Sequence, residues 1–241
     1  MASGRGPATI RRMPRAATIS RLSFGVLALA DVALAGAASP RAHRARRVTK
    51  PLLMPVLAAS FVTDPRSQAS PLRRSTQAGQ LFGWLGDLAL LGSGTGAFAA
   101  GMGAFGVGQA SYISGFRSVR NPEPLRHSPI GRIAAGLFAV SAPPMAWGAY
   151  RKDPVLGPGV LGYAALLTAM AAHAAHLDPR LAAGARRATA LGGAAFLASD
   201  TLLGARQFVL TDPPSWLESG VMATYTAAQY LLAEGALRAA S

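Results

Sequence analysis

The sequence predicts an all-α protein, an integral membrane bundle of about eight transmembrane helices. Composition is the first reason: 51% of the 241 residues are hydrophobic and only 14% are charged, whereas globular domains carry about 25% charged residues. The second reason is the pattern, because long apolar runs alternate with short arginine-rich gaps. The third is that every long run has helical character, and a lipid bilayer accepts only helices or closed barrels.

The net charge of +14 would suggest nucleic-acid binding in a soluble protein. Here most arginines lie in the gaps between apolar runs. We therefore interpret them as anchors at anionic lipid headgroups, and we expect no nucleic-acid partner. The absence of cysteine excludes disulfides and thiolate chemistry. We expect no metal and no other cofactor.

The N-terminal part has two possible interpretations. Residues 1–21 are basic and contain no acid, so we expect a disordered cytoplasmic tail before a single transmembrane domain at residues 22–241. The apolar run at residues 23–38 fits either a secretory signal peptide or a first transmembrane helix. Asp31 lies inside this run, which is unusual for a signal peptide. We therefore favour a retained helix.

The second apolar run, residues 50–62, is shorter than the roughly 20 residues that a straight span needs. We expect it either to extend by a few residues toward the N-terminus or to form a broken helix inside the bundle. Residues 40–47 before it are expected to form a basic loop.

Six further apolar runs complete the predicted bundle. One of them is rich in glycine, which allows close helix contacts, and the next contains two adjacent prolines, which kink a helix. The six predicted spans are residues 76–91, 97–116, 133–150, 155–176, 188–208 and 217–237.

The distribution of lysine and arginine predicts the orientation. With the N-terminus inside, the inner segments hold about twice as many of these cations as the outer ones, so the positive-inside rule favours cytoplasmic N- and C-termini. We expect a multi-pass protein of a bacterial plasma membrane. The first outer loop breaks the rule because it is strongly basic. A functional role for some of its cations would explain this exception.

The acidic residues inside apolar runs are the first candidate site residues. A charge within a membrane span costs about 2.5–3.5 kcal/mol on insertion scales, and such residues are functional by default. In the predicted topology three acids, Asp31, Asp87 and Asp200, lie in the outer half of the membrane. The cations Lys50 and Arg206 lie at the same face. We predict one cavity that these groups share; alternatively, each acid pairs with a cation only to orient helices.

Other polar residues could belong to the same site. Tyr225 and Gln229 are spaced i, i+4 on the last predicted span and therefore share one face. Gln109 and Tyr112 lie on an aromatic stripe of the fourth span, which packing alone can also explain. Ser199 directly precedes Asp200.

These residues carry a resemblance that runs from the first span to the last. The chain resembles the lysoplasmalogenase (YhhN-like) family of eight-helix membrane proteins. The matching residues are Thr49-Lys50-Pro51-Leu52, Gly86-Asp87, Phe105, Tyr112, Phe116, Tyr163, Met170, Phe196, Ser199-Asp200, Arg206, Phe208, Tyr225 and Ala228-Gln229. One position departs from the pattern, because family members often carry histidine where this chain has Gln109.

The resemblance implies hydrolysis of the vinyl ether bond of lysoplasmalogens, which releases a fatty aldehyde and a glycerophospho-headgroup. This reaction needs a protonated carboxylic acid and an ionised carboxylate. Glycosidases use two carboxyl groups for a reaction that passes through a similar oxocarbenium ion. We predict that Asp87 and Asp200 form this pair, without assigning the acid. Lys50 and Arg206 are candidates for the lipid phosphate.

The remaining candidates have less specific roles. Tyr225 and Gln229 are expected to orient water, and Tyr112, Gln109, Asp31 and Ser199 are further candidates for substrate binding. Two other functions stay open. A proton-coupled transporter would also use intramembrane charges, although the sequence shows no inverted repeat. A non-catalytic lipid-binding protein is favoured by Gln109 in place of histidine.

Overall fold

The computed structural model describes residues 15–37 and 39–240, and these form a helical bundle. No strand occurs in the described residues, so the all-α prediction is confirmed. Three elements are short: the helix α3 (Arg66–Ala69), the 3-10 helix η1 (Leu125–His127) and the π-helix η2 (Ala205–Val209). The long helices are α1 (Arg15–Gly36), α2 (Pro40–Val62), α4 (Arg73–Ala89), α5 (Gly94–Ser118), α6 (Pro129–Lys152), α7 (Leu156–Ala175), α8 (Ala183–Gly204) and α9 (Trp216–Arg238).

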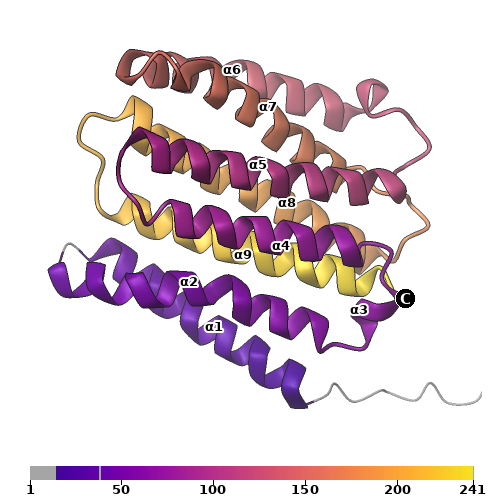
Figure 1. Cartoon of the computed structure of the whole chain (residues 1–241). Helices are drawn as coiled ribbons and strands as arrows, with labels where there is room; N and C mark the ends of the chain where they lie inside the picture. The colour runs from indigo at the N-terminus through magenta and orange to yellow at the C-terminus, as the bar shows by residue number, and fades with distance from the viewer. Residues whose placement is uncertain (1–14, 38, 241) are drawn as a thin grey trace, which may run out of the picture.

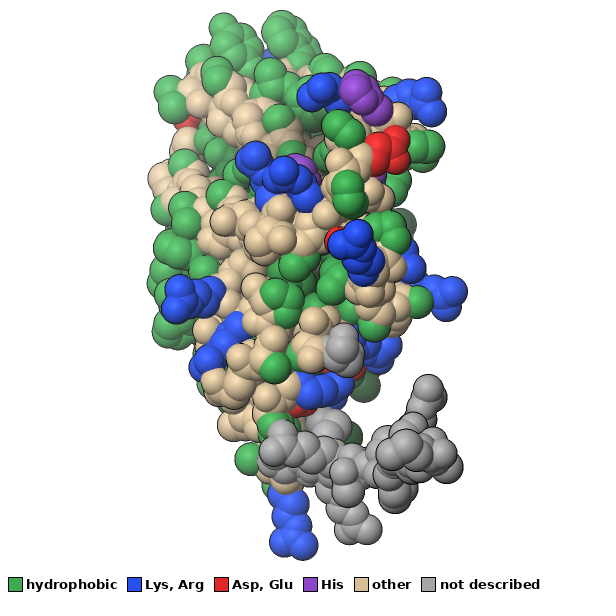
Figure 2. Space-filling view, turned by 90° about the vertical axis from the view of Figure 1, so that its right-hand side faces the viewer, with side chains coloured by type: hydrophobic (Ala, Val, Ile, Leu, Met, Phe, Trp, Pro, Cys, Tyr) green, Lys and Arg blue, Asp and Glu red, His purple; other side chains and the backbone are tan. Residues whose placement is uncertain are grey.

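The long helices run alternately up and down the bundle (Figure 1). The α1–α2, α4–α5, α6–α7 and α8–α9 links lie at one end, which we call the site end. The start of α1, α3, the α5–α6 and α7–α8 links and the C-terminus lie at the other, which we call the terminal end. Figure 2 shows that many lysine and arginine side chains and few acidic ones cover the terminal end.

Three helical segments are long and apolar enough to cross a membrane: Arg15–Gly36, Leu156–Ala175 and Ala183–Val209. The chain is therefore a membrane protein. That all eight long helices span the bilayer stays a prediction. Each long helix does coincide with one of the predicted spans, and their alternation brings both ends of the described chain to the terminal end.

The start of α2 corrects one prediction. Residues 40–47 are helical rather than a loop, so α2 is a continuous helix of 23 residues. The Ser39 hydroxyl accepts a hydrogen bond from the Ala42 amide at 3.2 Å, and Pro40 occupies the first turn, where proline is tolerated. Alanine and arginine are strong helix formers, so the run needs no apolar face to be helical.

The start of α1 corrects a second prediction. The helix begins at Arg15, so the tail predicted at residues 1–21 overlaps it in residues 15–21; residues 1–14 lie outside the described part. Arg21 explains the early start, because its guanidinium lies 2.9 Å from Asp64 and 3.2 Å from Glu234. These ion pairs attach the beginning of α1 to the α2–α3 link and to α9.

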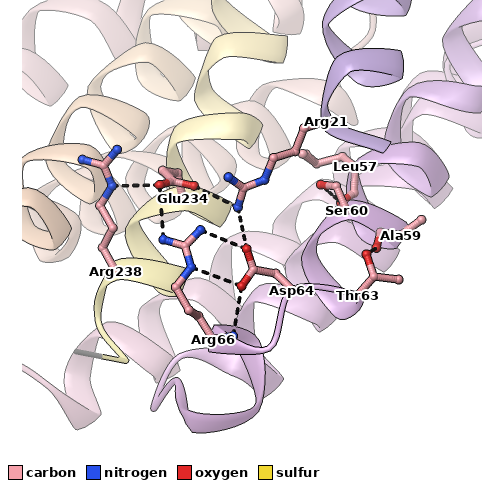
Figure 3. A network of polar contacts seen from close by, with 9 residues as sticks. All are labelled: Arg21, Leu57, Ala59, Ser60, Thr63, Asp64, Arg66, Glu234 and Arg238. Carbon is pink, nitrogen blue, oxygen red and sulfur yellow. Dashed lines mark hydrogen bonds and ion pairs between the residues drawn. The ribbon is translucent and has the colours of Figure 1, made fainter. Parts of the chain in front are cut away.

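An ionic cluster at the terminal end holds three helices together (Figure 3). Asp64 is 1% exposed and accepts hydrogen bonds from Arg21 at 2.9 Å and from Arg66 at 2.9 and 3.1 Å. Glu234 binds Arg238 at 2.8 Å as well as Arg21. Burial alone would raise the pKa of Asp64, but the hydrogen bonds and charge of Arg66 and the charge of Arg21 outweigh it and lower that pKa.

The lowered pKa predicts how stability depends on pH. Asp64→Asn should lower the free energy of unfolding by about 1–3 kcal/mol at pH 7, because it leaves the guanidinium groups of Arg21 and Arg66 without this charged acceptor. The carboxylate stabilises the fold above its unfolded pKa of about 3.9, and this stability is lost as the pH falls through the lower folded pKa. The difference between the two proteins should therefore shrink below about pH 4.

Thermal unfolding of the detergent-solubilised protein across this pH range measures the effect. Asp178→Asn is a matched control at the same end, because Asp178 accepts a hydrogen bond from the Arg180 amide but forms no ion pair among the described residues. Equal melting temperatures for wild type and Asp64→Asn at pH 7 would contradict the prediction.

Candidate functional site

A cavity of about 400 Å³ opens at the site end of the bundle. All long helices except α1 contribute to its wall. The wall is apolar over much of its area, through side chains such as Phe98, Met102, Phe105 and Met222, and its charged groups lie on α2, α4, α8, η2 and α9. The volume lies in the usual range for ligand sites, about 300–1,000 Å³.

Six of the predicted site residues line this cavity. They come from five elements, α2, α4, α8, η2 and α9, of which only α8 and η2 are adjacent in the sequence. The six are Lys50, Asp87, Ser199, Asp200, Arg206 and Tyr225. The Ser199 hydroxyl donates to the Val221 carbonyl at 3.0 Å, so it also joins α8 to α9. The other four candidates, Asp31, Gln109, Tyr112 and Gln229, do not line the cavity.

Asp87 has a cation and a hydroxyl as partners. The side chain is 2% exposed, and its carboxylate lies 3.5 Å from the Lys50 ammonium. The Tyr225 hydroxyl donates to it at 2.7 Å. Packing explains the neighbouring glycine, Gly86, because a Cβ atom there would lie 2.6 Å from the Phe105 ring. The partners around Asp87 suit an ionised carboxylate, since charge-assisted hydrogen bonds favour the charged form.

Two predicted site residues lie one layer behind Tyr225. The Gln229 amide donates to the Tyr225 hydroxyl at 3.5 Å, and the Tyr112 hydroxyl donates to Gln229 Oε1 at 3.1 Å. All of these side chains are buried. Gln229 and Tyr112 can therefore orient Tyr225 and, through it, Asp87, but they do not face the cavity. We expected Gln229 and Tyr112 to contact substrate or water directly, and this expectation does not fit their position.

Asp200 has different partners from Asp87. The Tyr163 hydroxyl donates a short hydrogen bond to it. Within the described part of the chain, no lysine or arginine forms an ion pair with Asp200. Gln109, the residue that departs from the family pattern, is buried and lies beside the Tyr163 hydroxyl. The amide can orient Tyr163, but unlike a histidine it cannot exchange a proton near neutral pH.

The mouth of the cavity contains a second ionic cluster. Glu218 binds Arg206 at 2.8 Å and also forms a short ion pair with Arg46. Arg46 in turn lies 3.6 Å from Asp31, which also accepts a hydrogen bond from Thr49 at 2.5 Å. Because Asp31 is fully buried away from the cavity wall, it holds α1 against α2 rather than facing a ligand.

Sequence reasoning did not include Arg46, Glu218 and Tyr163 among the site residues. Signals for all three existed. Arg46 belongs to the basic segment that breaks the positive-inside rule, and Glu218 lies seven residues before Tyr225, on the same helical face. Tyr163 was among the residues that carry the family resemblance. The sequence does not show which residues these three side chains pair with, because the partners lie on other helices.

The described residues contain no group of three or more histidine or acidic side chains placed to hold a metal ion. The two histidines of α7 and its end, His173 and His176, lie at the terminal end. His176 Nε2 lies 2.8 Å from the carbonyl oxygen of Glu123, a contact that joins the α5–α6 link to the end of α7.

Comparison with known proteins identifies a family that this chain matches. The model of the YhhN family matches residues 45–236. The matched region includes every polar residue of the cavity wall and excludes α1 with Asp31. No match is found among curated proteins, and none among solved structures.

Proposed function

Because the chain belongs to the YhhN family, the family of lysoplasmalogenases, we propose that it hydrolyses the vinyl ether bond of lysoplasmalogen-type lysophospholipids. The products are a fatty aldehyde and a glycerophospho-headgroup. One observation carries the proposal: two carboxylates with unlike partners, Asp87 and Asp200, line a single largely apolar cavity. This is the pair of groups that the reaction requires.

The proposed roles follow from those partners. Asp200 accepts a hydrogen bond from the Tyr163 hydroxyl and has no lysine or arginine paired with it in the described part of the chain, and it is the acid. Its proton goes to the vinyl carbon that is not bonded to oxygen, and the electrons of the double bond form the new C–H bond. Asp87, paired with Lys50, is the ionised carboxylate that faces the resulting oxocarbenium ion. Preorganised opposite charge of this kind stabilises a transition state strongly in a low-dielectric site.

Water then completes the reaction. It adds to the cationic carbon and passes a proton to the Asp200 carboxylate, which restores the acid. The hemiacetal formed collapses by breaking its bond to the glycerol oxygen, with a proton moving to that oxygen. One water is consumed, and aldehyde and alcohol are released. In this scheme Tyr225 and Tyr163 orient the two carboxylates, and Gln229 and Tyr112 act through Tyr225.

The headgroup is proposed to bind at the mouth of the cavity, where Arg206 and Arg46 lie. Both arginines bind Glu218, so a phosphate has to share them with this carboxylate or displace it. Arginine suits such a site, because its guanidinium binds phosphate with two parallel hydrogen bonds. Lys50, already paired with Asp87, is assigned to the reacting end rather than to the phosphate.

We also propose that the terminal end is cytoplasmic, so that the site end and its cavity face outward in a bacterial plasma membrane. The density of arginine and lysine at the terminal end supports this orientation, since cytoplasmic loops carry the excess of these residues. The basic start of α2 lies at the site end. Its Arg46 is engaged with Glu218 and Asp31 there, which offers a reason for the exception.

Product analysis tests the proposed reaction. The purified protein should release fatty aldehyde from a lysoplasmalogen and none from the analogue in which a saturated alkyl ether replaces the vinyl ether, because only the vinyl ether accepts a proton on carbon. A protein that binds both lipids without releasing aldehyde would be a lipid-binding protein instead. Uptake of a solute into vesicles driven by a pH gradient, without aldehyde release, would indicate a proton-coupled transporter.

A further inference from the structure

A second, apolar cavity of about 260 Å³ lies between α6 and α7. Each helix contributes one face to it, with residues spaced i, i+3, i+4 and i+7. The lining side chains are small apart from Leu125 and Phe138: Gly131, Ala134, Ala135, Ala165, Thr168, Ala169 and Ala172. Ala135 and Ala165 are exposed, so this groove opens at the surface of the bundle, where membrane lipid would be.

Backbone contacts fix the first and last turns of α6, on either side of the groove. A Cβ atom at Gly131 would lie 2.1 Å from the Leu125 carbonyl oxygen, so η1 packs directly on the first turn of α6. A Cβ atom at Gly148 would lie 2.1 Å from the Phe208 carbonyl oxygen, so η2 packs on its last turns. Between these contacts the α6 side chains that line the groove are small apart from Phe138.

The groove continues the candidate active site. Thr168 lines both cavities. On α6 the stripe that starts at Gly131 and passes Phe138 continues to Ser141 and Met145, which line the larger cavity. From Gly131 to Met145 the helix rises about 21 Å at roughly 1.5 Å per residue. One leaflet of hydrocarbon is about 15 Å thick, so the stripe is long enough for a single lipid chain.

We propose that the groove between α6 and α7 binds the aliphatic chain of the lysolipid while its vinyl ether lies in the larger cavity. The proposal rests on the proposed function for the reacting end of the ligand. The occupant is one chain of a single-chain lipid, because the groove is apolar, has a volume of about 260 Å³ and shares Thr168 with the wall of the polar site. The opening beside Ala135 and Ala165 also lets the chain enter sideways from the bilayer.

Chain-length selectivity tests this assignment. Ala169→Phe fills the groove next to Thr168, and should lower kcat/KM for a sixteen-carbon alkenyl substrate about tenfold or more while changing it by no more than about twofold for an eight-carbon one, since each unburied methylene weakens binding. Val140→Phe is the control, because Val140 lies on α6 but is 77% exposed and outside the groove. Loss of activity that is equal for both chain lengths would reject the proposal.

Labelling makes the test independent of catalysis and of how Ala169→Phe folds. A sixteen-carbon lysolipid with a photoreactive group at the end of its chain should label residues 131–138 and 165–172 of the wild-type protein, as read by peptide mass spectrometry. Label confined to other helices would reject the groove. If the wild type releases no aldehyde from any substrate, the proposed reaction fails; label in these two segments then still supports the groove as a lipid-chain site.

Discussion

Asp200→Asn should lower aldehyde release from lysoplasmalogen by about 10²–10⁴-fold, the usual contribution of a positioned general acid. Asparagine keeps the shape of the side chain and can still accept the hydrogen bond from Tyr163. It cannot supply a proton. Since Asp200 has no cation partner among the described residues, the substitution leaves no buried charge unpaired, and the melting temperature should stay close to that of the wild type.

Specific activity and thermal stability measured on the same detergent-purified samples separate catalysis from folding. Asp212→Asn is the control, because it makes the same chemical change at an exposed residue of the α8–α9 link. If Asp200 only orients helices, the opposite pattern is expected: a lower melting temperature and activity lost in proportion to folded protein. Near-normal specific activity in Asp200→Asn would show that the acid is another group.

Much of the bundle could be predicted from the sequence because a lipid bilayer accepts only helices or closed barrels. Apolar runs located all eight long helices, and their alternation brought Lys50, Asp87 and Asp200 to one end. The predictions were wrong where helix formation does not depend on apolar residues. The first turns of α2 are helical through capping by Ser39 and pairing of Arg46, and no hydrophobic pattern marks such a segment.

The layering of the site was harder to predict than its location. The i, i+4 spacing correctly placed Tyr225 and Gln229 on one face of α9, but it could not show that Tyr225 separates Gln229 from the cavity. Asp31 pairs with Arg46 near the mouth of the cavity, yet α1 contributes no residue to the cavity wall. The groove beside α6 is lined mainly by small residues of two helices, and the sequence does not reveal that these two stripes face each other.

Asp87→Asn should differ from Asp200→Asn because it affects stability as well as activity. The Lys50 ammonium lies 3.5 Å from the Asp87 carboxylate, and the lysine side chain is 13% exposed. Removing one member of a largely buried pair leaves the other uncompensated, which costs about 3 kcal/mol where solvent still reaches the site. Loss of the carboxylate that faces the oxocarbenium ion should also abolish measurable aldehyde release.

The double variant Asp87→Asn/Lys50→Met separates these two effects. Methionine fills much of the lysine volume without a charge, so the double variant should recover most of the melting temperature that each single variant loses, and it should remain inactive. The three variants and the wild type form a cycle that measures the coupling between the two side chains. Additive losses of stability would show that the pair is not coupled. An active double variant would exclude Asp87 as the carboxylate that stabilises the cation, because neither charge would then be needed for the reaction.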